Sequence, residues 1–248
     1  MSGHSKWATI KRKKGATDQA RGKVFSKYIK EITLAARAGA DPNMNPRLRT
    51  AIAGAKSVNM PANNIDRAIA RGAGLEEGVH FEETQYEGYG PGGVAILVEV
   101  ATDNRNRTAG EIRNTFTKHG SALGEAGSVS YLFKPHGVII VDKAVMSEEA
   151  LMEIVVEAGA DDVTSEGDTY EIITSPAQLE PVKEALAARS VPTLSAELTK
   201  IASLLVPVTE KQAESLLKLV DMLEDHDDVQ KVYANFSMSD ELMAKLAR

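Results

Sequence analysis

The sequence contains no cysteine, a single tryptophan and no long apolar run. Without cysteine the chain can form no disulfide, no thiolate zinc site and no cysteine nucleophile, which suits a reducing compartment. No stretch approaches the roughly 20 apolar residues that span a bilayer, and residues 1–20 lack the apolar core of a signal peptide or the Arg/Ser bias of a transit peptide. We therefore expect a cytoplasmic protein with no membrane partner.

Motifs for catalysis and metal binding are also missing. The five histidines show no i, i+4 pair. The acidic clusters Asp161-Asp162 and Asp225, Asp227, Asp228 lack the spacing of a calcium loop, and we interpret them as solvated. No G-x-S-x-G nucleophile motif occurs. We expect no enzyme, no metal and no cofactor.

The segment GYGPGG at residues 88–93 matches the dinucleotide pattern G-x-G-x-x-G. In a dinucleotide site this loop opens a helix, whereas here Pro91 leads into the strand-like residues 94–100. The context favours a tight turn between two strands. Tyr86 and Tyr89 beside it could stack on bases, although aromatic residues at strand ends more often pack.

Charge is distributed unevenly along the chain, whose formal net charge is -6. Residues 1–75 carry 15 Lys and Arg against 4 Asp and Glu, a net charge of +11. Residues 76–248 carry 14 against 31, a net charge of -17. This asymmetry indicates a basic module that meets a polyanion, joined to an acidic body.

The densest basic stretch is GHSKWATIKRKKGATDQARGKVFSK at residues 3–27. Its lysines can neutralise phosphates, Trp7 offers a ring to stack on a base, and Gly3 and Gly15 favour a mobile arm. A merely solvated charge run, or a chance match to a nuclear-localisation signal at Lys11 to Lys14, is the alternative.

After the arm, Asp18 to Arg37 has the pattern of a two-faced helix. The apolar face is formed by Phe25, Tyr28, Ile29, Ile32 and Ala36, and the opposite face by Lys23, Lys27, Lys30 and Arg37. Two short helices are expected next, one with Asn45 as N-cap and Pro46 first, the other with Pro61 first and Gly72 as C-cap. We expect a three-helix domain over residues 18–75, with the lysine face exposed.

Strand and helix patterns alternate beyond residue 79. Residues 80–133 predict a ββαβ unit, with a T-x-x-E capping box at Thr108 and a last strand at SVSYLF, residues 128–133. Residues 137–202 predict the ferredoxin-like order βαββαβ, with Pro181 starting or kinking the second helix. The tail supplies a helix capped by Thr209 and Gln212 and a strand at KVYANF.

These patterns predict an α+β protein of three domains, an N-terminal three-helix domain and two α/β sandwich-like domains. The expected domains are 1–78, then 79–133 joined by 205–248, with 134–204 inserted as the ferredoxin-like domain. Within the second domain, the segment TDNRNRTAGEIRN places Arg105 and Arg107 before a helix N-terminus. Such a loop can receive a phosphate, and an exposed polar loop is an equal alternative.

Several motifs together resemble the YebC family: the basic stretch itself, NPRLR at 45–49, NMP at 59–61, RAIARG at 67–72, YEGYGPGG at 86–93 and DNRNRT at 103–108. The resemblance is strongest over the first 135 residues, and as in bacterial members the first motif follows Met1 directly. It implies a helical N-terminal domain with two α/β domains, and a DNA-binding transcriptional regulator. Mitochondrial relatives of this family are translational activators of cytochrome oxidase, and bacterial relatives are linked to ribosomes translating proline-rich stretches.

Three functions remain open at this point. The basic domain could bind DNA, it could bind ribosomal RNA, or the ferredoxin-like domain could bind a small ligand or catalyse a reaction. Neutralising phosphates does not distinguish DNA from RNA, and the sequence leaves the oligomeric state open. The candidate nucleic-acid-binding residues are Lys6, Trp7, Lys11, Arg12, Lys13, Lys14, Arg21, Lys23, Lys27, Lys30, Arg67, Arg71, Arg105 and Arg107.

Overall fold

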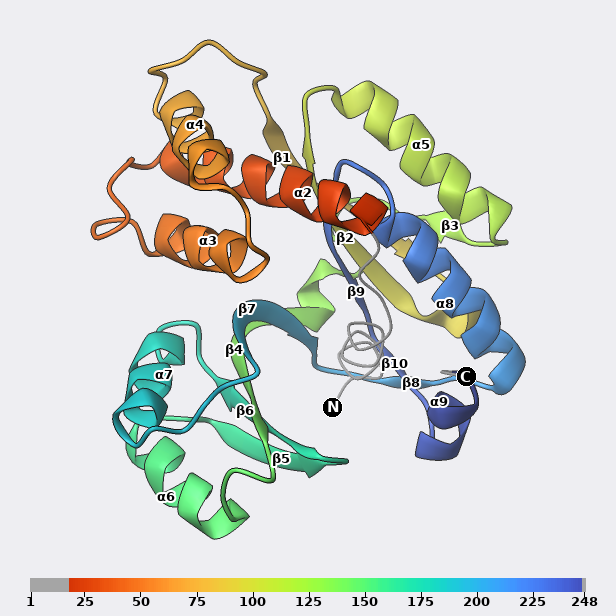
Figure 1. Ribbon diagram of the computed structural model, residues 1–248. Coiled ribbons are helices and arrows are strands. Elements are labelled where there is room, and N and C mark those ends of the chain that lie inside the picture. The colour runs from red at the N-terminus through yellow and green to blue at the C-terminus, as the bar shows by residue number, and fades with distance from the viewer. Residues whose placement is uncertain (1–17, 247–248) are drawn as a thin grey trace. The chain divides into compact units, whose positions relative to one another are not determined.

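Three helices open the part of the chain that the structure, a computed structural model, describes, residues 18–246 (Figure 1). The helices are α2 (Asp18–Ala36), α3 (Pro46–Ser57) and α4 (Ala62–Gly72). α3 and α4 both pack against α2, and Ile32, Leu48 and Ile65 are buried between them. The partly buried Phe25 and Tyr28 extend this core, so the predicted apolar face of α2 is confirmed.

The ends of these helices follow the sequence closely, with a shift of one residue at each end of α4. Asn45 is the N-cap of α3, and its side chain accepts a hydrogen bond from the N–H of Leu48. Pro61, expected as the first helical residue, is instead the N-cap of α4, because its ψ of 137° is extended. Its carbonyl accepts the N–H of Asn64, and the C-cap is Ala73, one residue after the expected Gly72.

An antiparallel sheet follows the helices, with strand order β3-β1-β2-β9. Its strands are β1 (Glu82–Tyr89), β2 (Ala95–Thr102), β3 (Ala122–Leu123) and β9 (Val229–Ala234). The turn between β1 and β2 holds the short 3-10 helix η1 (Pro91–Gly93), in which Gly92 and Gly93 have φ of 77° and 75°. Only glycine adopts this conformation easily, so the glycine motif serves a turn, as expected.

Two helices cover one face of this sheet (Figure 1). They are α5 (Arg105–Lys118) and α8 (Glu210–Glu224). Ile112 and Phe116 from α5 and Leu216 and Val220 from α8 are fully buried against Ile96 of β2. The other elements beyond residue 203 are β8 (Val206–Pro207), β10 (Phe236–Ser237), parallel to β8, and α9 (Asp240–Leu246). The capping box of Thr209 and Gln212 at the start of α8 is confirmed.

Two local predictions are wrong in this region. Thr108 does not cap α5, because Asn104 is the N-cap and Thr108 lies buried inside the first turn. Residues 128–132 do not form a strand but contain the 3-10 helix η2 (Ser130–Leu132), and only Phe133 of the expected strand belongs to one, as the first residue of the strand that follows. The buried carboxylate of Glu87 accepts the N–H groups of Gly127, Val129 and Ser130 at 2.7 to 2.8 Å. Those N–H groups are therefore unavailable to a strand ladder.

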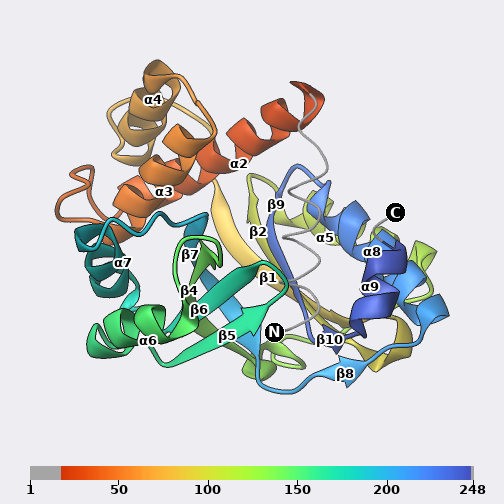
Figure 2. The same ribbon diagram turned by 60° about the horizontal axis from the view of Figure 1, so that its bottom comes forward.

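Leu132–Ser203 form a separate compact unit. Its elements are β4 (Phe133–Asp142), α6 (Glu148–Glu157), β5 (Asp162–Glu166), β6 (Thr169–Thr174), α7 (Leu179–Ala188) and β7 (Ser195–Ala202). The strands are all antiparallel in the order β5-β6-β4-β7, and both helices cover one face of the sheet (Figure 2). This is the predicted ferredoxin-like arrangement. α7 begins two residues before Pro181, which is tolerated because N–H groups of a first turn need no helical partner.

The observed mixture of helices with two four-stranded antiparallel sheets confirms the predicted α+β class. None of the helices between residues 18 and 246 is long and apolar enough to cross a membrane.

Candidate nucleic-acid interface

Lysines on one face of α2 reach the C-terminal end of α8. The Nζ atom of Lys23 donates to the carbonyl oxygen of Asp225 at 3.1 Å and lies 2.9 Å from its carboxylate. Lys27 Nζ donates to the carbonyl oxygen of Glu224 at 2.8 Å. The last carbonyls of a helix lack helical partners and carry partial negative charge. The two ammonium groups therefore stabilise the end of α8.

Lys30 makes a largely buried contact with the same region. Its Nζ atom donates to the carbonyl oxygen of Asp227 at 2.9 Å and lies 2.7 Å from Oδ1 of Asp228. The side chains of Lys30 and Asp228 are 12% and 7% exposed. The ammonium group also lies 5.5 Å from the ring centre of Phe81, within range of a cation–π contact. Removing the Asp228 carboxylate would leave the Lys30 ammonium group buried without a counterion.

These contacts correct two expectations from the sequence. We call Lys23, Lys27 and Lys30 the lysine row, and residues 224–228, EDHDD, the acidic segment. The lysine row contacts the acidic segment instead of lying open to solvent. Interpreting these acids as solvated is wrong for Asp228, which is buried. Nucleic acid can reach the row only if the acidic segment moves away, so its role in binding stays a prediction.

Asp228 also connects the acidic segment to the start of α5. Its Oδ2 accepts hydrogen bonds from Thr108 at 2.7 Å, Arg107 at 2.8 Å and Thr102 at 3.1 Å. Burial raises the pKa of the Asp228 carboxyl, but the hydrogen bonds that it accepts, first among them the one from Lys30, outweigh burial. The pKa of Asp228 therefore lies well below its usual range.

Arg105 and Arg107, predicted to lie in a loop before a helix N-terminus, lie instead in the first turn of α5, because Asn104 is its N-cap. One of the two is paired and the other is exposed. Arg107 Nη2 lies 2.8 Å from Oδ1 of Asp103 and 2.8 Å from Asp228, so this guanidinium is already occupied. The side chain of Arg105 is exposed and makes no hydrogen bond or ion pair with another residue of the described part. Arg105 therefore fits the predicted contact better than Arg107.

Three possible metal ligands, from Glu111, His226 and Asp228, lie within 4.8 Å of one another. His226 Nε2 lies 2.8 Å from Oε2 of Glu111, and its Nδ1 accepts the N–H of Asp228 at 3.1 Å. Both carboxylate oxygens of Asp228 already accept from Lys30 and Arg107. Because two cations occupy this carboxylate, the cluster joins α5 to the acidic segment and does not suit a metal ion.

The candidates on α4, Arg67 and Arg71, lie near a single carboxylate. The Nε atom of each is 3.9 Å from Oε2 of Glu76, a distance too long for a hydrogen bond. Arg71 Nε is buried and has no hydrogen-bond partner among residues 18–246. Both guanidinium groups can therefore donate hydrogen bonds to a further anionic ligand.

The remaining candidates cannot be placed. Lys6, Trp7, Lys11, Arg12, Lys13 and Lys14 precede residue 18 and lie outside the described residues, as does the side chain of Arg21. Their role in binding nucleic acid stays a prediction from the sequence. Sequence reasoning also missed the acidic segment as a partner of α2. The opposite net charges of the two parts of the chain were the available signal.

Two sequence profiles match most of the chain. The profile described as "TACO1/YebC protein N-terminal domain" matches residues 5–75, and "TACO1/YebC second and third domain" matches residues 81–236. The chain belongs to the TACO1/YebC family.

Members of the TACO1/YebC family with similar sequences carry one common name. A "probable transcriptional regulatory protein" of Geobacter sulfurreducens is 58% identical over 247 residues, covering 99% of this chain and 100% of the relative. One from Dictyoglomus thermophilum is 54% identical over 249 residues, covering 100% of both chains. The crystal structure of a conserved hypothetical protein from Aquifex aeolicus is 50% identical, with a TM-score of 0.80, covering 89% of this chain and 91% of that one. That neighbour supports the same fold for this chain.

Proposed function

We propose that the protein is a nucleic-acid-binding regulator of gene expression, and specifically a DNA-binding transcriptional regulator of the YebC type. One observation carries the proposal. Residues 1–75, which include the match to the family's N-terminal domain, hold 15 Lys and Arg against 4 Asp and Glu. A domain so basic within an acidic chain is suited to bind a polyanion. The names of the relatives agree with a role in transcription.

The binding that we propose depends on phosphate contacts and involves no catalysis. Arg67 and Arg71 on α4 and the exposed Arg105 at the start of α5 offer guanidinium groups without close carboxylate partners. Guanidinium groups bind phosphate oxygens in pairs of parallel hydrogen bonds. The lysine row would add three cations once the acidic segment is displaced.

Ribosomal RNA is the second candidate ligand, and one structural feature favours it. The lysine row is the cationic face that α2 would offer to a DNA duplex, and the acidic segment covers it. Arg71 and Arg105 instead lie at helix ends. Cations at scattered helix ends suit the irregular backbone of a folded RNA, where shape and phosphate contacts dominate recognition.

Sedimentation of cell extracts together with duplex-DNA binding distinguishes the two ligands. For a DNA-binding regulator, the full chain binds duplex DNA at moderate salt and stays at the top of the gradient, away from ribosomes. For the RNA alternative, the chain cosediments with ribosomes at low salt and is released as salt rises, because phosphate contacts are salt-dependent. A chain that binds neither DNA nor ribosomes at low salt contradicts both.

A further inference from the structure

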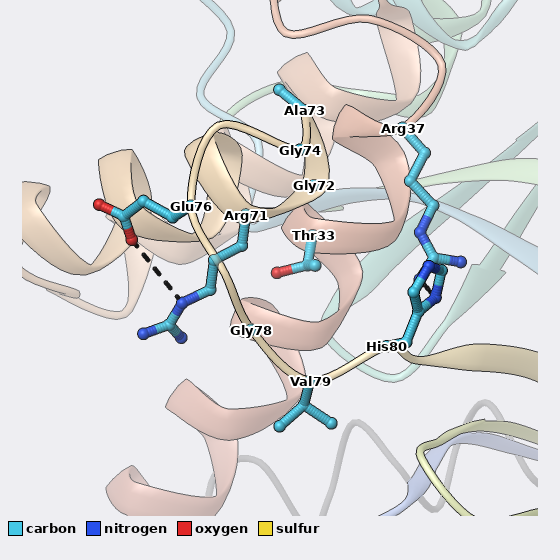
Figure 3. A pocket seen from close by; sticks show the side chains of 10 residues that line it. All are labelled: Thr33, Arg37, Arg71, Gly72, Ala73, Gly74, Glu76, Gly78, Val79 and His80. Carbon is cyan, nitrogen blue, oxygen red and sulfur yellow. Dashed lines mark hydrogen bonds and ion pairs between the residues drawn. The ribbon is translucent and has the colours of Figure 1, made fainter.

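A cavity of about 340 Å³ lies where the ends of α2 and α4 meet the chain leading to β1 (Figure 3). We call it the α2–α4 pocket. Its polar side chains are those of Thr33, Arg37, Arg71, Glu76 and His80. Its volume is at the lower end of the range of about 300 to 1,000 Å³ found for ligand sites. The lining holds two arginines, Arg37 and Arg71, and one carboxylate, Glu76, so it carries a net positive charge.

Arg71 has an unsatisfied hydrogen-bond donor in this pocket. Its Nε atom is buried, makes no hydrogen bond within the described part of the chain, and lies 3.9 Å from the Glu76 carboxylate. A buried N–H without an acceptor costs free energy. Figure 3 shows the Arg71 side chain extending along the pocket wall toward Glu76, with the Thr33 hydroxyl group beside it. An acceptor carried by a ligand would satisfy this donor.

Arg37 and His80 supply donors on the other side of Thr33 (Figure 3). Arg37 Nη2 lies 2.8 Å from Nδ1 of His80. A guanidinium can only donate, so Nδ1 of His80 accepts and the ring proton is on Nε2. Nε2–H of His80 has no hydrogen-bond partner within residues 18–246. Donors therefore lie on both sides of the pocket.

Glycines keep the backbone close to this pocket. A Cβ at Gly72 would lie 2.2 Å from the carbonyl oxygen of Thr33, so α4 can approach α2 closely only with glycine there. A Cβ at Gly78 would lie 3.1 Å from Cδ of Arg71, so the loop runs directly over the arginine side chain. The small residues thereby hold the guanidinium groups near a confined space.

We propose that the α2–α4 pocket binds a phosphate group of a nucleic-acid strand, with Arg71 donating from one side and Arg37 with His80 from the other. The inference rests on the proposed function and deepens it by naming the contact site. The competing explanation is structural, because arginines at the C-terminal ends of α2 and α4 also stabilise those helices. The two explanations differ in what they predict for nucleic-acid affinity.

Fluorescence anisotropy of the full chain with labelled DNA and RNA hairpins, over a range of salt, tests the pocket. We expect R71Q and R37Q each to weaken binding about tenfold and to lower the slope of log affinity against log salt by about 1. R49Q removes an equal charge from α3, where Arg49 donates to the carbonyls of Pro42 and Asn43, and it should leave the slope unchanged. E76Q removes the pocket's carboxylate and should tighten binding.

Three results would overturn the pocket proposal. R71Q and R37Q could bind like R49Q, E76Q could bind no more tightly than the unmodified chain, or R71Q could lower the melting temperature without changing affinity. The last result supports the purely structural explanation. E76Q keeps every cation in place, so it tests the pocket even if an arginine variant fails to fold.

Titration with inorganic phosphate separates this proposal from the proposed function. The readout is the NMR signal of the Arg71 Nε–H group, compared between the unmodified chain and R37Q. If the chain binds neither nucleic acid yet this signal shifts at millimolar phosphate and shifts less in R37Q, the proposed function fails and the pocket instead takes free phosphate. If the chain binds nucleic acid while the Arg71 signal moves with neither ligand, the pocket proposal fails and the proposed function stands.

Discussion

Lys30 Nζ lies 2.7 Å from Oδ1 of Asp228, which is 198 residues further along the chain. Both side chains are largely buried, and Asp228 also accepts hydrogen bonds from Arg107 and Thr108 of α5. This carboxylate therefore joins the basic helix α2 to the sheet and helices of the same unit. The stability of that unit should therefore depend on the charge of Asp228.

D228N should lower the free energy of unfolding by about 3 kcal/mol at pH 7, because it leaves the Lys30 ammonium buried without its counterion. Chemical denaturation measures the loss. D168N, which neutralises an exposed acid at the turn between β5 and β6, serves as control and should change stability by less than about 0.5 kcal/mol. Equal stabilities of D228N and D168N would contradict the role of the buried pair.

The stabilisation from Asp228 should also depend on pH. The pKa of Asp228 in the folded chain lies below the value of about 3.9 expected when unfolded. A group with a depressed pKa stabilises the fold above its unfolded pKa, and the stabilisation is lost as pH falls toward the folded pKa. The stability difference between the unmodified chain and D228N should therefore be constant from pH 7 to about pH 5 and shrink below about pH 4. A difference that grows on acidification contradicts this account.

Reversing the charge of the lysine row should destabilise the fold. Replacing all three lysines by glutamate places negative charge against the acidic segment and removes the buried Lys30 contact. We expect a loss of about 3 kcal/mol or more. The matched control replaces the exposed Lys118, Lys211 and Lys218 by glutamate. If both triple variants melt at the same temperature, the lysine row makes no stabilising contact in solution.

The acidic segment should compete with nucleic acid for the lysine row. D225N/D227N removes two negative charges beside the row and should tighten nucleic-acid binding severalfold at low salt. D161N/D162N makes the same change in net charge at exposed acids of the other unit. Anisotropy titrations of both variants give the comparison. Identical gains would show that net charge alone matters and that the acidic segment does not compete.

Glu87 should be important for the segment that follows β3. Its buried carboxylate accepts hydrogen bonds from three backbone N–H groups. Burial raises the pKa of Glu87, but these hydrogen bonds outweigh burial, so the pKa lies below its usual value. E87Q places an amide NH₂ group against backbone N–H donors, which should lower the free energy of unfolding by about 2 to 3 kcal/mol. E125Q, at an exposed site in the same loop, is the control. If E87Q and E125Q unfold at the same denaturant concentration, the Glu87 carboxylate does not stabilise this segment.

Much of the fold could be predicted because its signals are local. Asn45 before Pro46, Thr209 before Gln212 and the glycines of residues 88–93 each determine a cap or a turn through neighbouring residues. The alternation of strand and helix patterns over residues 137–202 was enough to predict the ferredoxin-like unit.

The wrong predictions concern residues whose hydrogen bonds or ion pairs are made with a side chain distant in the sequence. Residues 128–133 have the pattern of a strand, but the N–H groups of Val129 and Ser130 donate to Glu87, which lies on β1. The pattern predicts Thr108 as the N-cap of a helix, but its hydroxyl group donates to Asp228. The lysine row was predicted to be solvent-exposed because a charged helix face has the same sequence pattern whether it is solvated or paired with a distant segment. Such pairings depend on the tertiary fold, and the sequence pattern does not contain them.

The central claim is that residues 1–75 bind nucleic acid through its phosphates. Its most direct test is the slope of log affinity against log salt for the full chain and for a chain lacking residues 2–20. Each phosphate contact contributes about 0.7 to 0.9 to that slope, so the deletion should weaken binding and flatten the slope by several such contributions. An unchanged slope after the deletion contradicts the claim.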